Sequence, residues 1–405
     1  MTISIRATEP HEYRQAATAF LIALMQPPPD DEAWERNRAS WEGVPSFSAW
    51  DATSCVGHAS TGLVDTTVSG GARLATSAVT RVGILPTYRR QGIATGLMQA
   101  LIDDALARSL VLMSLRASEA VIYGRFGFGI AGDHSMVSID PARATPLIGA
   151  SDGGSLRILE PTEIVDVTGP LYERIAHRRP GVITRPTAWQ MRLVRSAVER
   201  TTASFVAVHC DHDGRPDGYV HYTVTWSDGA TPVTSGEGEV HDLWGASDGV
   251  ELALWRYVLE LDLVTVWTSS TRPVDDLLRR AVADPRAYQQ VAVQDEQWLR
   301  LIDVDRALGG RTYNAASGSV TIQVTDPLIS SNNGTWRISA DGAVRTADAP
   351  DLRVGIETIS AAYLGGPSWA SLAGTGVVEL LDGNAIATAD ALFASRPLPY
   401  CGTFF

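Results

Sequence analysis

The segment from Val82 to Thr95 has the composition of an anion-binding turn at the start of a helix. A run rich in Val, Thr and Ile over 75–85 predicts a strand, which Pro86 ends, and Arg89-Arg90-Gln91-Gly92-Ile93-Ala94 follows it. At a helix N-terminus, unpaired backbone N–H groups and the helix dipole attract an anion. Gly92 allows a phosphate to approach the backbone, Ala94 keeps the wall low, and both arginines can add charge-assisted hydrogen bonds. The pattern therefore predicts a phosphate site.

The elements that must hold this turn are predicted to form a mixed α/β layer. The segment 88–108 is expected to be helical, since apolar residues recur on one face, and a strand is expected over 110–115 and a short helix over 119–125. The order strand, helix, strand, helix is typical of an α/β fold. The apolar positions of the long helix are Ile93, Leu97, Leu101 and Ala105.

A second motif, Ser118-Glu119-Ala120-Val121-Ile122-Tyr123-Gly124-Arg125-Phe126-Gly127-Phe128, follows about thirty residues later. Together, Arg-Arg-x-Gly-x-Ala after a strand and the later Tyr-x-x-Phe-Gly-Phe resemble the GNAT superfamily of acetyl-CoA-dependent N-acetyltransferases. The resemblance implies that the turn binds the coenzyme A pyrophosphate, that the backbone of the strand pairs with the pantetheine arm, and that Tyr123 protonates the departing thiolate. If Tyr123 has no such role, it only packs a helix. The implied cofactor-binding residues are Val82, Gly83, Ile84, Arg89, Arg90, Gln91, Gly92, Ile93, Ala94, Thr95, Ser118 and Glu119.

The same order of elements recurs in weaker form over about 218–283, which indicates a diverged duplicate. In the duplicate, Gly245-Ala246-Ser247-Asp248-Gly249-Val250 takes the place of the arginine turn. It has no arginine, and Asp248 would repel a pyrophosphate, so we expect only the first copy to bind coenzyme A. From about 297 short strands and a helix near 358–363 predict a third, α+β unit.

This layout resembles the enhanced intracellular survival (Eis) family of aminoglycoside acetyltransferases, to which Tyr363-Leu364-Gly365-Gly366 and the terminal Phe404-Phe405 also correspond. The resemblance implies an α/β (α+β) chain with an intact GNAT domain at 1–135, a degenerate one at 136–292, and a domain like a sterol carrier protein at 293–405. It also implies a homohexamer with acetyl-CoA as cosubstrate. We expect no metal, because the cluster His209-Cys210-Asp211-His212-Asp213 ends in a turn signal and has no partner cluster.

The resemblance gives the C-terminal carboxylate of Phe405 the role of accepting the proton of the substrate amine. An α-carboxyl has an ordinary pKa near 3.5, so as a base it needs desolvation or a relaying water. The alternative from the residues alone is that Phe404 and Phe405 fill a hydrophobic gap.

A polycationic acceptor needs acidic walls and aromatic faces. A Pro-broken stretch between two predicted helices supplies candidates, and in this superfamily that region borders the acceptor cleft. A surface charge run is more often only solvated. The candidates are Asp30, Asp31, Glu32 and Trp34.

The composition narrows the classes of protein to which this chain can belong. The 405 residues carry 33 basic and 46 acidic side chains, a net charge of −13, which argues against a general nucleic-acid partner. Three cysteines exclude a disulfide framework. The N-terminus lacks a signal peptide and no run is long enough to span a membrane, so a cytoplasmic protein is expected, with secretion not excluded.

The expected function is acetyl transfer to amines of aminoglycosides or similar polyamines. Two alternatives remain open. One is a protein lysine N-acetyltransferase, and the other is a lipid- or sterol-binding protein with a vestigial transferase site.

Overall fold

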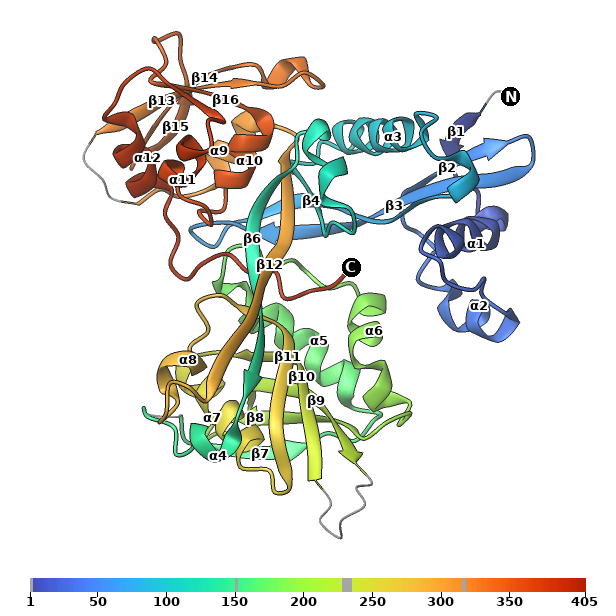
Figure 1. Cartoon of the computed structure of the whole chain (residues 1–405), viewed down its shortest axis with the longest axis vertical. Coiled ribbons are helices and arrows are strands. Elements are labelled where there is room, and N and C mark those ends of the chain that lie inside the picture. The colour runs from blue at the N-terminus through green and yellow to red at the C-terminus, as the bar shows by residue number, and fades with distance from the viewer. Residues whose placement is uncertain (1–2, 150–151, 228–234, 315–317) are drawn as a thin grey trace. The chain divides into compact units, whose positions relative to one another are not determined.

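The computed structural model describes residues 3–149, 152–227, 235–314 and 318–405 (Figure 1). Internal contacts divide the chain into two units. Unit 1 contains residues 1–131, 297–395 and 404–405, and unit 2 contains residues 132–296 and 396–403. Within the described residues, every helix is too short or too polar to cross a bilayer.

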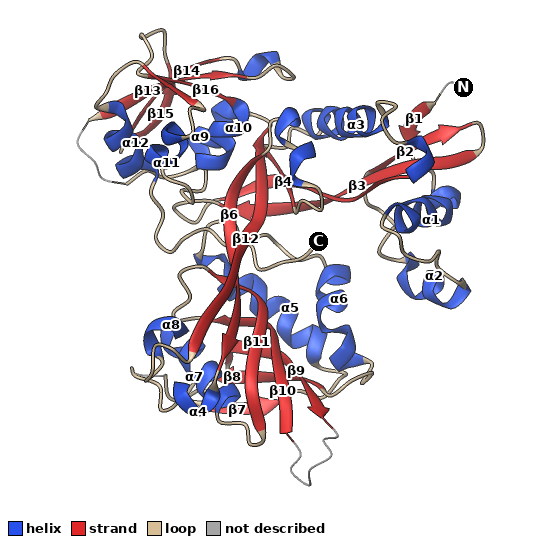
Figure 2. Cartoon of the chain, in the orientation of Figure 1, coloured by secondary structure: helices blue, strands red, loops and turns tan. Residues whose placement is uncertain are grey.

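The N-terminal part of unit 1 is a twisted sheet with helices on both faces (Figure 2). Successive side chains of a strand point to opposite faces of the sheet. Ala49 and Val56 therefore pack with α3 on one face. Their neighbours Trp50 and Cys55 pack with α1 on the other face. All strand pairs are antiparallel except β4 with β5, which are parallel. The strand order in this part of the sheet is β1 (Ser4–Ala7), β2 (Ser46–Asp51), β3 (Ser54–Thr67), β4 (Arg73–Ile84), β5 (Leu112–Leu115) and the end of β12 (Tyr288–Leu301). The helices are α1 (Tyr13–Ala23), α2 (Asp31–Arg38) and α3 (Ile93–Ala107).

The predicted apolar face of α3 is buried at all four positions, Ile93, Leu97, Leu101 and Ala105. The helix begins at Ile93 rather than near 88. Pro86–Tyr88 forms a 3₁₀ turn instead, and positive φ angles at Arg90 and Gly92 separate that turn from the helix. The short helix expected at 119–125 is a pair of 3₁₀ turns, Ala120–Ile122 and Gly124–Phe126.

The C-terminal part of unit 1 is a five-stranded sheet with helices packed against it. Its core includes Trp336, Tyr363 and Trp369, and the same cluster contains Val68, which follows β3, and Val111, which precedes β5. The strand order is β15 (Gly342–Arg345), β14 (Gly334–Ser339), β13 (Ser319–Thr325), β16 (Leu352–Gly355), β17 (Val378–Leu380), and the helices are α9 (Val304–Gly310), α10 (Ile356–Ala362), α11 (Trp369–Gly374) and α12 (Ala385–Phe393).

Unit 2 repeats the α/β arrangement. Strand β10, helix α7 and strand β11 follow one another, and the two strands pair in parallel, as β4, α3 and β5 do in unit 1. The helix expected at 274–283 is only α8 (Leu278–Ala281). The strand order is the first part of β12, β6 (Gly129–Ile139), β11 (Val264–Pro273), β10 (Ser235–Gly245), β9 (Pro216–Ser227), β8 (Ser204–Cys210), β7 (Ser155–Ile158), and the other helices are α4 (Pro141–Ala144), α5 (Ile164–Ile175), α6 (Thr187–Val198) and α7 (Asp248–Leu259).

Candidate active site

The strand before the turn separates from its parallel neighbour. β4 pairs with β5 only from Thr76 to Val79, but it continues along β3 as far as Ile84. The register between β3 and β4 is irregular around Arg81, whose φ is +54°. Such a bulge bends a strand away from its partner. The backbone of residues 82–84 therefore lies beyond the end of the β4–β5 ladder.

The side chain of Arg81 contacts the segment between α2 and β2. Its guanidinium carbon lies 4.3 Å from the centre of the Trp41 ring, and Nη2 donates a hydrogen bond to Ser40 Oγ at 3.0 Å. A non-glycine residue with positive φ carries backbone strain. These contacts compensate for that strain.

The turn between β4 and α3 has the geometry expected of an anion site. Gly92 is the N-cap residue of α3 with φ +79°, and a Cβ placed there would meet no atom within 4 Å. The position thus requires glycine for its backbone angle and leaves open space over the helix N-terminus. Arg89 and Arg90 are exposed, and neither forms an ion pair with an acidic side chain of the described residues. Both guanidinium groups are therefore available to an anion.

These residues share one pocket of about 600 Å³ within unit 1. Among the twelve predicted cofactor residues, only Gln91 does not line it. Met98 also lines the pocket, as do Ala23 and Leu24 from the end of α1, and no sequence motif contained these three residues. Arg125 lines it too; it lies in the second motif but was not among the predicted site residues. The predicted residues in the lining are Val82, Gly83, Ile84, Arg89, Arg90, Gly92, Ile93, Ala94, Thr95, Ser118 and Glu119, and Tyr88, Ile122 and Tyr123 complete it.

Tyr123 lies between the two 3₁₀ turns and lines the pocket, although only 5% of its surface is exposed. Its ring packs edge-on against Phe128, with 6.1 Å between ring centres. Its carbonyl accepts hydrogen bonds from the N–H groups of Phe126 at 3.0 Å and Phe128 at 3.3 Å. Burial raises the pKa of the phenol, and the nearby charge of Glu119 raises it further. The hydroxyl therefore keeps its proton at neutral pH, as a general acid must.

The two terminal residues belong to unit 1, the unit that contains the pocket. Phe404 is 63% exposed, and its ring lies 5.3 Å from the guanidinium carbon of Arg116, two residues before Ser118 in the lining. Phe404 therefore does not fill a hydrophobic gap. Phe405 is 6% exposed, as the gap-filling alternative expects for this residue.

The four acceptor candidates lie elsewhere than in this pocket. Asp30 is the N-cap of α2 and accepts a hydrogen bond from the N–H of Ala33 at 2.8 Å, and Trp34 is buried against Trp41. The other two form surface ion pairs, Asp31 with Arg14 at 2.5 Å and Glu32 with Arg36 at 3.5 Å. Their role at an acceptor site stays a prediction.

The corresponding turn of unit 2 is occupied by side chains of the protein itself. Ser247 caps α7 by accepting a hydrogen bond from Val250 N–H at 3.1 Å, and it donates one to the carboxylate of Asp152. Asp248 lies beside them, 3.5 Å from Arg178. Two carboxylates and a filled cap leave this helix start without the positive field that an anion needs. The arrangement agrees with coenzyme A binding in the first copy alone.

Comparisons with known proteins agree with this geometry. The GNAT acetyltransferase domain matches residues 4–131 and, as a second family model, residues 181–301, and the sterol carrier protein domain matches residues 304–402. The fold and pocket thus define a tandem GNAT N-acetyltransferase followed by a domain like a sterol carrier protein.

Several relatives resemble the chain over most of its length. An uncharacterized N-acetyltransferase of Streptomyces avermitilis is 32% identical over 88% of both chains, and the N-acetyltransferase Eis of Mycobacterium tuberculosis is 29% identical over 81% of this chain and 80% of its own. The crystal structure of Eis1 from Mycobacterium abscessus has a TM-score of 0.88 and 34% identity, with 99% of this chain and 100% of that chain covered. The chain belongs to the Eis family of GNAT N-acetyltransferases.

Proposed function

We propose that the protein transfers the acetyl group of acetyl-CoA to amines of polycationic small molecules, with aminoglycosides as the leading class. One observation carries the proposal: a single pocket combines the arginine turn, the strand backbone beyond the β4–β5 ladder, and Tyr123. GNAT acetyltransferases in general use acetyl-CoA, and the open space over Gly92 fits a diphosphate.

Acetyl-CoA supplies an acetyl thioester when it is bound. Arg89, Arg90 and the N-terminus of α3 hold the diphosphate, and backbone groups of residues 82–84 hold the arm that follows it. Tyr123 protonates the leaving sulfur, and the Phe405 carboxylate takes the proton of the attacking amine, directly or through a water. Both residues act within one ternary complex, so no acyl-enzyme is needed.

The acceptor class rests on charge and on the family. The net charge of −13 attracts polycations, and the family resemblance favours aminoglycosides among them. Asp31 and Glu32 pair with arginines at the surface, where such pairs are weak, so an incoming ammonium group can compete for both carboxylates. By the same resemblance we propose a homohexamer, which light scattering can test.

The test is the release of free coenzyme A thiol from acetyl-CoA in the presence of aminoglycosides, simple polyamines or lysine peptides. We expect rapid release with aminoglycosides, with more than one acetyl group per molecule. Release with lysine peptides alone would instead make the protein a lysine acetyltransferase. Silence across the panel, with acetyl-CoA still bound, would refute the acceptor class but not the cofactor site.

A further inference from the structure

A second pocket, of about 360 Å³, lies within unit 2 beside the start of α7. The elements that border it are the counterparts of those around the pocket of unit 1 (Figure 1). The end of α5 corresponds to the end of α1, the end of β10 to that of β4, the start of α7 to that of α3, and the segment at the end of β11 to the one after β5. The duplicate therefore has a pocket at the same place in its fold, although its turn contains no arginine.

The arginines that line this second pocket are already paired. Each of the three forms an ion pair with an acidic residue of the same lining, and each also donates to a backbone carbonyl. The ion pairs are Arg178 with Asp248 at 3.5 Å, Arg179 with Asp275 at 2.5 Å, and Arg272 with Asp276 at 2.7 Å. An anion would have to displace a carboxylate of the protein from each arginine, so the pocket is not a site for a phosphate.

One carboxylate of the lining is left over. Glu251, in the first turn of α7, forms neither a side-chain hydrogen bond nor an ion pair with the part of the chain that the structure describes. A Cβ placed on Gly245 would lie 2.8 Å from Glu251 Cγ, so the stem of this side chain lies against the end of β10. The end of β10 also lines the pocket, which brings the carboxylate of Glu251 to the inside of the second copy's pocket.

The surroundings of Glu251 remove much of its hydration. Burial raises the pKa of this carboxyl to about 6, although Arg272, Arg179 and Arg178 pull it down while Asp276 pushes it up. At pH 7 about nine in ten molecules still carry the charge. A desolvated carboxylate without a partner is unfavourable, and a cation in the pocket would compensate for it.

The lining favours an ammonium group over a metal ion. Hard metal ions take about six oxygen ligands, and no group of three or more metal-ligating side chains is found among the described residues. An ammonium group has three N–H donors and can be held by one carboxylate with water on the other sides. Ile175, Trp244 and Leu277 supply apolar walls for an alkyl chain, and a volume near the lower end of the range of small-molecule pockets suits a short one.

We propose that the pocket of unit 2 binds the ammonium group of a small aliphatic amine, with Glu251 as its counter-ion. The two copies then have opposite preferences, an anion at the arginine turn of the first and a cation in the pocket of the second. The site goes beyond acetyl transfer and does not depend on it, because it lies in unit 2 and is tested without acetyl-CoA.

Trp244 lines the pocket and can report binding directly. The full chain is labelled with 5-fluorotryptophan, and the ¹⁹F signal of Trp244 is assigned by its absence in W244F. This signal is followed during titration with n-butylammonium chloride, with sodium chloride at equal ionic strength as the reference. n-Butanol and sodium butyrate serve as neutral and anionic probes of the same chain length.

Two variants remove one negative charge each from the same lining. E251Q keeps the shape of a side chain that has no partner to lose, so its Tm should not fall. D248N is the matched control, because Asp248 is already paired with Arg178. The pH dependence of the wild-type chain gives a further measure that needs no substitution.

We expect a saturable shift of the Trp244 signal with n-butylammonium and none with the other two probes. E251Q should weaken binding about tenfold or more, whereas D248N should change the Kd less than about twofold. Protonation of Glu251 should raise the wild-type Kd about tenfold between pH 7 and pH 5 and leave that of E251Q unchanged.

Four results would overturn the site. They are the absence of a saturable shift in the wild-type chain, an equal shift with n-butanol, equal loss of binding in E251Q and D248N, and a wild-type Kd that is independent of pH. Acetyl transfer is not measured in any of them, so the outcome does not bear on the function proposed for unit 1.

Discussion

Replacing Tyr123 by phenylalanine tests the proposed general acid with very little structural disturbance. The change removes one oxygen from a ring that is 5% exposed and packed against Phe128. The hydroxyl forms no hydrogen bond with the part of the chain that the structure describes. We therefore expect a loss of stability well below the ~1 kcal/mol of a lost hydrogen bond.

The rate should change much more. General acid catalysis typically contributes ~10²–10⁴-fold, so kcat should fall at least about 100-fold, which corresponds to about 2.7 kcal/mol of activation free energy. Affinity for acetyl-CoA should remain, because the arginine turn and the strand backbone hold the cofactor rather than the phenol. The raised pKa of Tyr123 adds a second expectation: deprotonation of this acid should not lower kcat at any pH below about 10, the ordinary pKa of a tyrosine.

The assay is coenzyme A thiol release under saturating amine, combined with calorimetric titration of acetyl-CoA. Y13F is the matched control, since Tyr13 is a buried tyrosine of the same unit that does not line the pocket. It should keep kcat. Equal losses of kcat and acetyl-CoA affinity in Y123F, or a kcat as high as that of Y13F, would refute the assignment of Tyr123 as the acid.

Three other variants test the cofactor turn and one buried histidine. G92A should raise the KM for acetyl-CoA, whereas G43A, with φ +73° and the same open surroundings, should cost the same ~1 kcal/mol of stability without changing KM; equal KM values would contradict the anion site. Burial lowers the pKa of His58 to about 3, so below about pH 6.5 this histidine binds a proton in the unfolded chain but not in the folded chain. The free energy of unfolding therefore decreases as the pH falls from 6.5 toward 3, by about 2 kcal/mol between pH 7 and pH 5. In H58F, urea unfolding at several pH values should lack this part of the pH dependence. In R89Q/R90Q, acetyl-CoA affinity should fall and lose much of its salt dependence, as calorimetry at two ionic strengths would show, and an unchanged salt dependence would refute the phosphate role.

Local patterns in the sequence determined several elements of the fold and the turn of the pocket. The strand before Pro86, the turn through Gly92 and the buried face of α3 follow from residue types and short-range spacing, and the structure has all three. Tyr123 could be predicted as a residue of the pocket because its motif is contiguous, and it lines the pocket. The duplicate at β10, α7 and β11 could be predicted because the order of its elements repeats that of the first copy.

Only the tertiary structure decided the features that depend on partners far along the chain. The separation of β4 from β5 comes from a bulge at Arg81, whose angle is supported by Trp41 forty residues earlier. The pairing of Asp31 with Arg14 likewise depends on where two helices pack, which no spacing in the sequence reveals.

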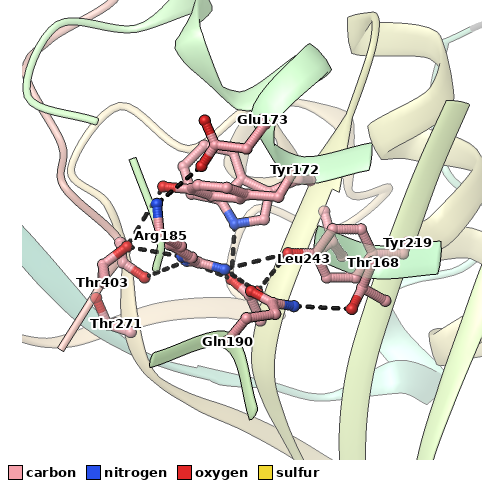
Figure 3. A network of polar contacts seen from close by, with 12 residues as sticks. Thr168, Tyr172, Glu173, Arg185, Gln190, Tyr219, Leu243, Thr271 and Thr403 are labelled. Carbon is pink, nitrogen blue, oxygen red and sulfur yellow. Dashed lines mark hydrogen bonds and ion pairs between the residues drawn. The ribbon is translucent and has the colours of Figure 1, made fainter. Parts of the chain in front are cut away.

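The polar network around the buried Arg185 of unit 2 is the clearest case (Figure 3). Arg185 gathers acceptors from Tyr219, Asp242, Gly402 and Thr403, residues up to 218 positions away, into one buried group. In the sequence each of these is an ordinary polar residue. Their shared role exists only because a buried guanidinium must have every N–H paired, and folding alone determines which acceptors are within reach.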